Sequence, residues 1–383
     1  MSARDGNHAR DEVMRQPARP SLRRQMIGGA IVLLLGVLAV AVSRPRPDPW
    51  PARAVVVGPP GGKLLDWGND DRMVFGDRVT VVAINPTSGE SQTRLADGLL
   101  AGRASSRDRR HFVATDLLAN DAHQVAWGDA ASGAVEARFG DPGLQAFRPA
   151  VEPGERSVRA FLRDARWPNR IRQVATWDVA TGAESRRPVT GPSWADPRTD
   201  GEVVAPDGRT IAYLDRATHG VQLWDVDADR PIGGPFAAGS TPLAPAEGST
   251  FTPDGQRLVL TRGDGRAEVW GRDGTLVRRF VVHAGFRTLL AAVSPDGRTL
   301  ASGGVLLPPP SWAGRAVLQT RAFFAEAQWR ATHEVVLVDL ATGQRLARAA
   351  GAAAPRFAPD GRDVATLGRD NTWTIRAVPA AGR

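Results

Sequence analysis

The chain has 383 residues, a formal net charge of +8 and no cysteine, and its 41 glycines and 29 prolines exceed average use. The absence of cysteine excludes disulfides, thiolate metal sites and a cysteine nucleophile. Charged and hydrophobic fractions of 23% and 42% are those of a globular protein. We therefore expect a packed domain with many tight turns.

Positive charge is distributed unevenly along the chain. Residues 1–46 hold eight arginines against three acidic residues, whereas basic and acidic residues alternate through most of the remainder. Binding of nucleic acid would need a concentrated basic patch with stacking aromatics, so no nucleic-acid partner is expected. Lys63 is the only lysine, and this preference for arginine is typical of a high-GC bacterial genome.

The first distinct segment is an uncharged apolar run over residues 26–43. As a helix it would be about 27 Å long, against a hydrocarbon core of about 30 Å. Arginines flank the run on both sides, where their side chains can extend to the headgroups. We predict a transmembrane helix at 26–43, with a basic tail, residues 1–25, in the cytoplasm according to the positive-inside rule.

Two other interpretations of this run remain. A cleaved signal peptide is suggested by the small residues of Ala39-Val40-Ala41, but the apolar run is longer than usual and the preceding tail is long. A buried core helix is disfavoured by the uninterrupted apolar circumference and charged flanks. Residues 44–52 are a proline-rich spacer with Trp50, a residue suited to a membrane interface. The chain beyond is expected on the extracytoplasmic side.

From residue 53 onward a pattern of short alternating strands and tight turns recurs. Its first half is a Pro-Asp-Gly turn, in which proline presets φ, aspartate caps the turn and glycine accepts a positive φ. Clear copies occur at 206–209, 253–255, 295–298 and 359–362, and weaker copies at 153–156, 107–110 and 69–72. The repeat is thus present seven times.

The second half of the repeat is an apolar strand that ends in Trp-Asp or a variant, with Thr-Gly or Ser-Gly shortly after it, as at Trp177-Asp178 and Trp224-Asp225. With both halves, residues 53–383 resemble the WD-repeat β-propeller family. This resemblance implies an all-β fold, a seven-bladed β-propeller of four-stranded antiparallel blades. The Pro-Asp-Gly turns also resemble those of the periplasmic propeller of the Tol system, which keeps a six-bladed count open and would imply a cleaved N-terminus.

The sequence departs from the strict WD form in two respects. It lacks the Gly-His dipeptide, so we expect the buried Asp-His-Ser-Trp network to be absent and the blades to be held by packing. The tryptophan of the closing strand is replaced at Ile84 and Arg376.

The two ends of the repeat region complement each other. After Val378 too few residues remain for the outer strand of the last blade, whereas residues 53–57 form a spare strand. We predict that this N-terminal strand closes the ring, which would remove an exposed sheet edge. The spacer would then attach at the face that carries the Pro-Asp-Gly turns, and the opposite face would point away from the bilayer.

Candidate contact residues lie in connections on that opposite face. The longest connection, residues 303–332, carries aromatic side chains interleaved with arginines, a combination typical of interface anchors. The alternative is that a helix over 315–331 packs on the rim of its own propeller. The candidate partner-binding residues are Trp312, Arg321, Phe323, Phe324 and Trp329, with Trp167 and Trp194 in the smaller connections 164–170 and 192–197.

Catalytic and metal-binding motifs are incomplete. Residues 58–63 are one residue short of a phosphate loop and lead into a strand. Asp225, Asp227 and Asp229 have calcium-loop spacing, but Arg230 replaces the required glycine, so a Trp-Asp turn explains them better. The six histidines show no paired ligand spacing, and no Gly-x-Ser-x-Gly motif occurs. We predict no cofactor and no catalytic residue.

The sequence therefore favours a membrane-anchored, non-enzymatic propeller that serves as a protein-protein interaction scaffold, with an unidentified protein partner on the face distal to the membrane. The alternative functions are a propeller hydrolase, a small-ligand sensor with its site at the channel mouth, or an envelope propeller similar to that of the Tol system. Clustered carboxylates at the channel mouth would favour the hydrolase or sensor.

Overall fold

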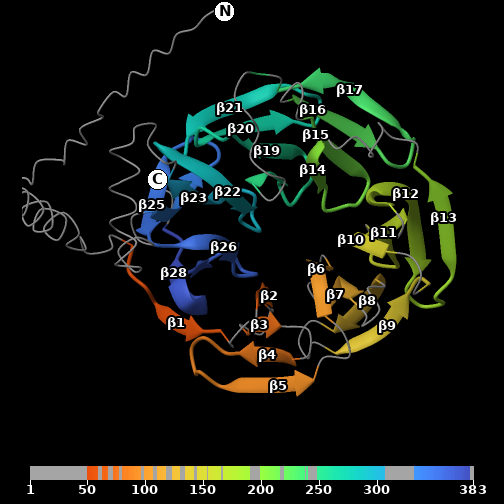
Figure 1. The fold of residues 1–383 in the computed structure, drawn as a ribbon, viewed down its shortest axis with the longest axis horizontal. Coiled ribbons are helices and arrows are strands. Elements are labelled where there is room, and N and C mark those ends of the chain that lie inside the picture. The colour runs from red at the N-terminus through yellow and green to blue at the C-terminus, as the bar shows by residue number, and fades with distance from the viewer. Residues whose placement is uncertain are drawn as a thin grey trace, which may run out of the picture. The chain divides into compact units, whose positions relative to one another are not determined.

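The structure is a computed structural model in which residues 48–383 form one compact unit. It describes residues 50–379 except 59–62, 68–71, 77–79, 96–98, 107–109, 118–122, 130–133, 142–144, 153, 165–166, 190–198, 216–219, 238, 240–247 and 307–331. The described strands form a β-propeller, in which sheets are arranged around a central axis (Figure 1). No helix in this described part is long and apolar enough to cross a membrane, and the segment predicted to do so, 26–43, lies outside it.

The strands follow the ring in chain order. The first sheet contains β2 (Lys63–Trp67), β3 (Met73–Gly76), β4 (Thr80–Ile84) and β5 (Ser91–Leu95). The next contains β6 (Leu99–Ser105), β7 (His111–Leu117), β8 (His123–Asp129), β9 (Val135–Phe139), β10 (Gln145–Val151), β11 (Ser157–Asp164), β12 (Trp167–Asp178) and β13 (Glu184–Pro188). It is followed by the sheet of β14 (Thr199–Val204), β15 (Thr210–Asp215), β16 (Gly220–Asp225) and β17 (Arg230–Phe236).

Three sheets complete the ring. One contains β18 (Thr250–Phe251), β19 (Arg257–Thr261), β20 (Arg266–Gly271) and β21 (Leu276–Val281). Another contains β22 (Phe286–Val293), β23 (Thr299–Leu306), β24 (His333–Asp339) and β25 (Arg345–Ala350). The last contains β26 (Ala353–Phe357), β27 (Asp363–Leu367), β28 (Thr372–Ala377) and β1 (Ala54–Val57), with a short 3-10 helix, η2 (Arg369–Asn371), between β27 and β28.

The predicted fold class is wrong in its blade count. The described strands form six hydrogen-bonded sheets rather than seven, five of four strands and one of eight. The eight-stranded sheet arises because β8 and β10 pair in parallel at Gln145 and His123, which joins β6–β9 to β10–β13. The fold is therefore an all-β propeller of six sheets, without a membrane-spanning helix in the described part.

The Pro-Asp-Gly turns have the predicted chemistry. In one copy the N–H of Gly297 donates to the carbonyl of Ser294 (2.8 Å), and the N–H of Arg298 donates to Asp296 Oδ1 (3.0 Å). The φ angle of Gly297 is 74°, in the region that glycine adopts without a steric penalty. Equivalent aspartate bonds occur at Asp207, Asp254 and Asp360.

Backbone bonds join the two halves of the repeat. The N–H of Leu340, which directly follows β24, donates to the carbonyl of Arg298 in the Pro-Asp-Gly turn (2.8 Å). Four other repeats have the same bond, namely Val179 to Arg156, Val226 to Arg209, Arg272 to Gln256 and Val378 to Arg362. Both kinds of turn therefore lie on one side of the ring, here called the turn face, and the connections between second and third strands define the opposite loop face.

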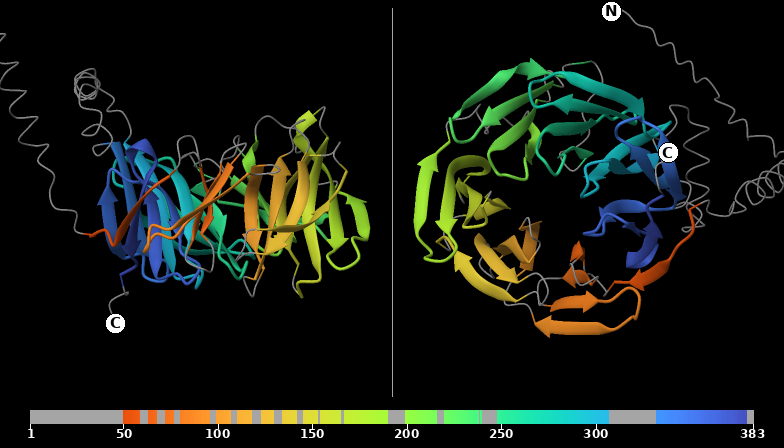
Figure 2. Two further views of the ribbon diagram at one scale, coloured as in Figure 1. Left: turned by 90° about the horizontal axis from the view of Figure 1, so that it is seen from below. Right: turned by 180° about the vertical axis from the view of Figure 1, so that it is seen from behind.

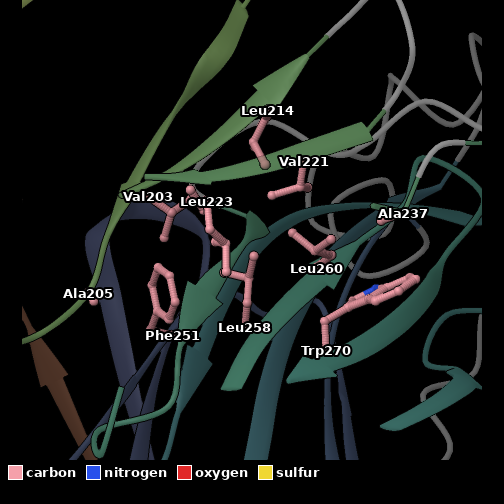
Figure 3. Packing of buried hydrophobic residues seen from close by; sticks show 11 residues of the cluster. Val203, Ala205, Leu214, Val221, Leu223, Ala237, Phe251, Leu258, Leu260 and Trp270 are labelled. Atoms are coloured by element: carbon pink, nitrogen blue, oxygen red, sulfur yellow. The ribbon is translucent and has the colours of Figure 1, made fainter. Parts of the chain in front are cut away.

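Burial follows the radial position of each strand. The middle strands β19 and β20 are almost entirely buried, because neighbouring sheets cover both of their faces, whereas the outer strand β21 is largely exposed. Figure 3 shows this packing between two sheets, with Leu223 directed toward Leu258. Each such side chain contributes about 1.5–3 kcal/mol when it is fully buried.

The predicted closure by the N-terminal strand is confirmed. β1 pairs with β28 in antiparallel register from Ala54–Ile375 to Val57–Thr372, and so becomes the outer strand of the last sheet (Figure 1). The chain reaches β1 from the turn face, since Arg53 pairs with Asp363 at the start of β27 (2.8 Å).

Trp50 belongs to the propeller, which corrects its predicted place at a membrane interface. It is 4% exposed, and its Nε1 donates to the carbonyl of Ala377 (2.7 Å). Arg376, which replaces the repeat tryptophan, donates from Nε to the carbonyl of Trp50 (3.0 Å) and from Nη1 to Thr366 Oγ1 (2.7 Å). Its guanidinium also lies 5.6 Å from the Trp50 ring centroid. The spacer therefore supplies the aromatic ring that this repeat lacks.

Ring closure gives the first testable prediction. Trp50→Ala should lower the free energy of unfolding by about 3–5 kcal/mol, because it removes a buried indole, its hydrogen bond to Ala377 and its contact with the Arg376 guanidinium. Arg53→Gln breaks only a largely exposed ion pair and should cost less than about 1 kcal/mol. Urea unfolding of both variants measures the difference, and equal effects would contradict a closing role for Trp50.

The turns give a second prediction. Gly255 has φ of 68°, and a Cβ there would meet nothing within 4 Å, so only backbone strain opposes Gly255→Ala. We expect a loss of about 1–2 kcal/mol in the free energy of unfolding. Gly234 has equally open surroundings without a positive φ, so Gly234→Ala is the matched control and should be neutral or stabilising by less than about 1 kcal/mol. Similar losses in both variants would refute the assigned turn geometry.

Candidate functional site

The candidate contact residues fall mainly outside the described residues. Trp312, Arg321, Phe323, Phe324 and Trp329 belong to segment 307–331, and Trp194 belongs to segment 190–198. Trp167 is described as the first residue of β12. The structure therefore defines the strands that carry these segments, and so the side of the ring from which they leave.

The connection around Trp167 is a hairpin rather than the enlarged loop predicted over 164–170. β11 and β12 remain paired up to Asp164 and Trp167, with shifts in register after Leu162 and after Arg163. Only residues 165–166 separate the two strands. The additional residues thus lengthen two strands at the loop face.

The long insertion 307–331 starts from the middle of its sheet. β23 and β24 are paired up to Val305 and His333, next to its two ends. Two glycines in β23 allow neighbouring groups to approach: a Cβ on Gly304 would lie 2.8 Å from His283 Nδ1, and one on Gly303 would lie 3.3 Å from Pro355 Cδ. The base of the insertion is therefore tightly packed.

A buried hydrogen-bond network lies in the sheet from which this insertion leaves. His283 Nδ1 is 2.7 Å from Glu334 Oε1, and His283 Nε2 is 3.0 Å from Ser302 Oγ. Arg348 on the outer strand donates from Nε to Glu334 Oε2 (2.5 Å). His283 and Ser302 are fully buried. The expectation that packing alone would hold the blades is thus wrong for this sheet, which joins a preceding connection and three strands through polar side chains.

The neighbouring sheet, β18–β21, also contains a buried polar network, which is built from different residues. Glu268 of β20 accepts from Arg262 Nη2 (2.9 Å) and Trp270 Nε1 (3.1 Å) through Oε2, and from Arg279 Nε (2.8 Å) through Oε1. Arg262 also donates to the carbonyl of Ala237, in the connection that precedes this sheet. Arg262, which directly follows β19, therefore extends toward the connection before its sheet, whereas His283 extends from the connection before the β22–β25 sheet into that sheet.

An arginine on the outer strand recurs in three sheets. Arg138, Arg279 and Arg348 occupy matching positions, opposite Ala126, Glu268 and Val336 of the adjacent strand. Each reaches a carboxylate that is almost fully buried, namely Asp116 (2.8 Å), Glu268 (2.8 Å) and Glu334 (2.5 Å). The acid lies on a different strand, or at a different position along the strand, in each sheet. The arginine–acid pair therefore has no fixed sequence spacing by which it could be predicted.

The electrostatics of Glu334 follow from this network. Burial alone would raise the pKa of Glu334, but the hydrogen bond from His283 and the positive charges of His283 and Arg348 outweigh burial. The pKa of Glu334 is therefore lowered. For Glu268 the same balance, with Arg262 as the main hydrogen-bond donor, also lowers the pKa.

Ser302, His283 and Glu334 are hydrogen-bonded in the same succession as a serine–histidine–acid triad, with the histidine between the serine and the acid. In hydrolases the serine oxygen must be accessible to a substrate carbonyl. Here the side chain of Ser302 has no exposed surface and lies in a middle strand. This trio therefore fastens the sheet and does not provide an accessible nucleophile.

The Asp225–Asp229 segment forms a turn, as predicted, and its carboxylates are occupied by protein groups. Asp225 Oδ1 accepts the N–H groups of Asp227 and Ala228 (both 2.9 Å), and Asp229 Oδ1 accepts from Trp224 Nε1 (3.1 Å). Asp227 Oδ1 binds Arg159 Nη1 of the preceding sheet (2.9 Å). These acids therefore cap a turn and connect two sheets.

An open groove of about 560 Å³ lies on the circumference, between β9 and β13. Its floor includes Phe139 and Trp177, whose rings stack with centroids 6.1 Å apart. The Asp141 carboxylate at its margin is paired with Arg186 (2.9 Å). In position this groove differs from the channel mouth that the hydrolase or sensor hypothesis requires.

Comparison with known proteins adds no family assignment. No family model matches the sequence, and no curated protein matches it either. The β-propeller fold is therefore what is established for this chain.

The Glu334 network predicts a pH-dependent stability. Because its folded pKa lies below its unfolded value, the charged Glu334 stabilises the fold above its ordinary pKa of about 4.3, and this contribution disappears as the pH falls through the lowered pKa. Glu334→Gln should cost about 3–5 kcal/mol near neutral pH, because it breaks a buried pair, and progressively less in acid.

Chemical unfolding at a series of pH values measures this effect, with Glu90→Gln as the control at an exposed position. The control should differ little from the natural protein throughout. A loss in Glu334→Gln that stays constant down to acid pH would show that the carboxylate charge is not responsible.

Proposed function

We propose that this protein is a membrane-anchored, non-enzymatic interaction scaffold, a propeller of the WD-repeat type held at the membrane through residues 26–43. The observation that carries the proposal is the way the chain joins the ring. Trp50 and β1 complete the last sheet, so the segment that precedes them is attached directly to the outer strand at the turn face. The loop face is then left open for a partner.

The WD-repeat type is supported by the polar networks. A histidine from the connection before a sheet, bonded to a serine on the second strand, resembles the arrangement of that family, although Glu334 joins the pair here. The Trp-Asp turns at Asp178 and Asp225 and the Val-Asp turn at Asp339 add to this resemblance, since each aspartate caps its turn.

The scaffold role is supported by how the buried polar groups are used. Asp116, Glu268 and Glu334 are bound by outer-strand arginines. Their charges are thereby used within the fold, and the Glu334 pair ties together strands β24 and β25 of the sheet from which the insertion 307–331 leaves. A rigid base with a long aromatic-rich connection is the usual construction of a binding surface.

Crosslinking in cells tests the scaffold role. The full chain is compared with a variant in which residues 307–331 are replaced by a short Gly-Ser turn, which keeps the Val305–His333 pair. We expect a protein partner to crosslink to the natural chain and its yield to fall at least about tenfold in the variant, as loss of interface hot spots requires. Thermal unfolding of both must match first.

Point variants distinguish docking on the insertion from docking on the smaller candidate connection, residues 164–170. Trp312→Ala with Trp329→Ala should reduce the crosslinked partner, whereas a loss seen only in Trp167→Ala would assign docking to the β11–β12 hairpin and not to the insertion. If the same partner is recovered from all variants, or none from the natural chain, the insertion is not a docking element and the scaffold proposal is rejected.

A further inference from the structure

Among the residues whose side-chain exposure the structure describes, the large apolar side chains that remain exposed belong to two outer strands. The large hydrophobic residues that remain exposed there are Val55, Val57, Leu276, Val277 and Val281. The first two belong to β1 and the others to β21. Val57 is the most exposed, at 67%. Single exposed apolar residues are common on protein surfaces, but their confinement to outer strands of one side of the ring needs an explanation.

These two strands are the ends of one arc. The sheet of β22–β25 lies between the sheet of β21 and the sheet of β1, so the outer strands follow the circumference in the order β21, β25, β1 (Figures 1 and 2). β25 is the sequence Arg-Leu-Ala-Arg-Ala-Ala, with Arg345 and Arg348 exposed. We name the surface of β21, β25, β1 and Arg53 the basic arc.

The basic arc contains arginines and no acidic residue. Its five arginines are Arg53, Arg278, Arg279, Arg345 and Arg348. Two of them donate to backbone carbonyls, Arg278 to Thr342 (3.1 Å) and Arg345 to Val282 (3.3 Å). The remaining three pair with Asp363, Glu268 and Glu334 but keep about half of their side chains or more exposed. The arc thus presents five guanidinium groups, three of them in ion pairs, beside exposed aliphatic side chains.

The opposite side of the ring lacks this combination. Outer strands β9 and β13 contain Glu136 and Glu184 beside their arginines, and the groove between them includes Asp141. The most exposed apolar residues are absent from both strands. The arc therefore differs from β9 and β13 in combining arginines with strongly exposed aliphatic side chains and no acidic residue.

We propose that the basic arc lies against the surface of an anionic lipid bilayer. A cationic surface with exposed aliphatic side chains is the composition that binds at the headgroup level, where each arginine contributes through the surface potential and each valine through burial. The occupant is further indicated by covalent connection, because only residues 44–53 separate β1 from the apolar segment 26–43. The inference rests on the proposed anchoring through that segment.

The spacer is short enough to bring the arc to the membrane. Residues 44–52 contain four prolines, and a proline-rich segment of nine residues spans about 28 Å when extended. Because Trp50 is already packed against β28, the free part is shorter. The outer strand β1 must therefore stay near the bilayer surface once residues 26–43 are inserted.

The absence of cysteine allows a direct test on the full chain. Single cysteines replace Val277 or Val57 on the arc, or Ser185 on β13 as the matched control, and carry an environment-sensitive fluorophore. The protein is reconstituted in vesicles of phosphatidylcholine with about one quarter phosphatidylglycerol, or of phosphatidylcholine alone. Quenching by spin-labelled lipid reports contact of each labelled site with the bilayer.

We expect quenching at Val277 and Val57 in the anionic vesicles, little in the neutral vesicles and none at Ser185. Arg278→Gln should lower the contact equilibrium read at Val57 about fivefold, the effect of one basic side chain near an anionic surface. Arg230→Gln on β17, an exposed outer-strand arginine away from the arc, should leave it unchanged.

Each failure has a distinct meaning. A chain that does not float with either vesicle overturns the anchoring and this inference together. A chain that floats without quenching at the arc overturns the inference and leaves the scaffold proposal intact. Equal quenching in both lipids excludes an electrostatic contribution to the contact between the arc and the bilayer. Shielding of Val277 only on addition of another protein assigns the arc to a protein partner. Either result also overturns the inference as stated.

Discussion

Closure of the ring by β1 is the interaction on which the rest of the structure depends. In a propeller the middle strands of each sheet are buried only because a neighbouring sheet covers each face, so an open ring would expose two apolar faces at once. Here the closing strand comes from the opposite end of the described chain, and its register with β28 is fixed by Trp50 and Arg376. The same segment joins the propeller to the N-terminal region. The integrity of the fold and the point of attachment are therefore one feature.

The turns and the closure could be predicted from sequence because their causes are local. A Pro-Asp-Gly turn needs one positive φ and one capping carboxylate, and both are visible in three consecutive residues, as at Asp296 and Gly297. A spare strand at one end and a missing strand at the other could likewise be counted. The number of sheets could not, because the single parallel pairing of Gln145 with His123 has no local signature. It converts seven sequence repeats into six sheets.

The buried polar networks were missed for a related reason. The sequence signal for a WD-type network is a dipeptide, and the chain lacks it, yet His283 reaches Ser302 and Glu334 from a different local sequence. A buried histidine before an inner strand, followed by a serine on the next strand, was the signal that remained. The role of Trp50 was missed because Trp50 and Arg376, which replaces the repeat tryptophan, are separated by most of the chain. Such pairs become visible only when the ring is closed.

The same sheet links the two proposed surfaces. The insertion 307–331 leaves from β23 and β24, and β25 of this sheet is the centre of the basic arc. Glu334 links β24 to the arc, because it binds both His283, in the connection before this sheet, and Arg348 on the arc. A partner that docks on the insertion would thus be held beside the bilayer if the arc lies on lipid, since the insertion leaves from the sheet whose outer strand, β25, is the middle strand of the arc. Two arginines of the arc, Arg279 and Arg348, are then placed where each binds a buried acid on one side and can face an anionic surface on the other.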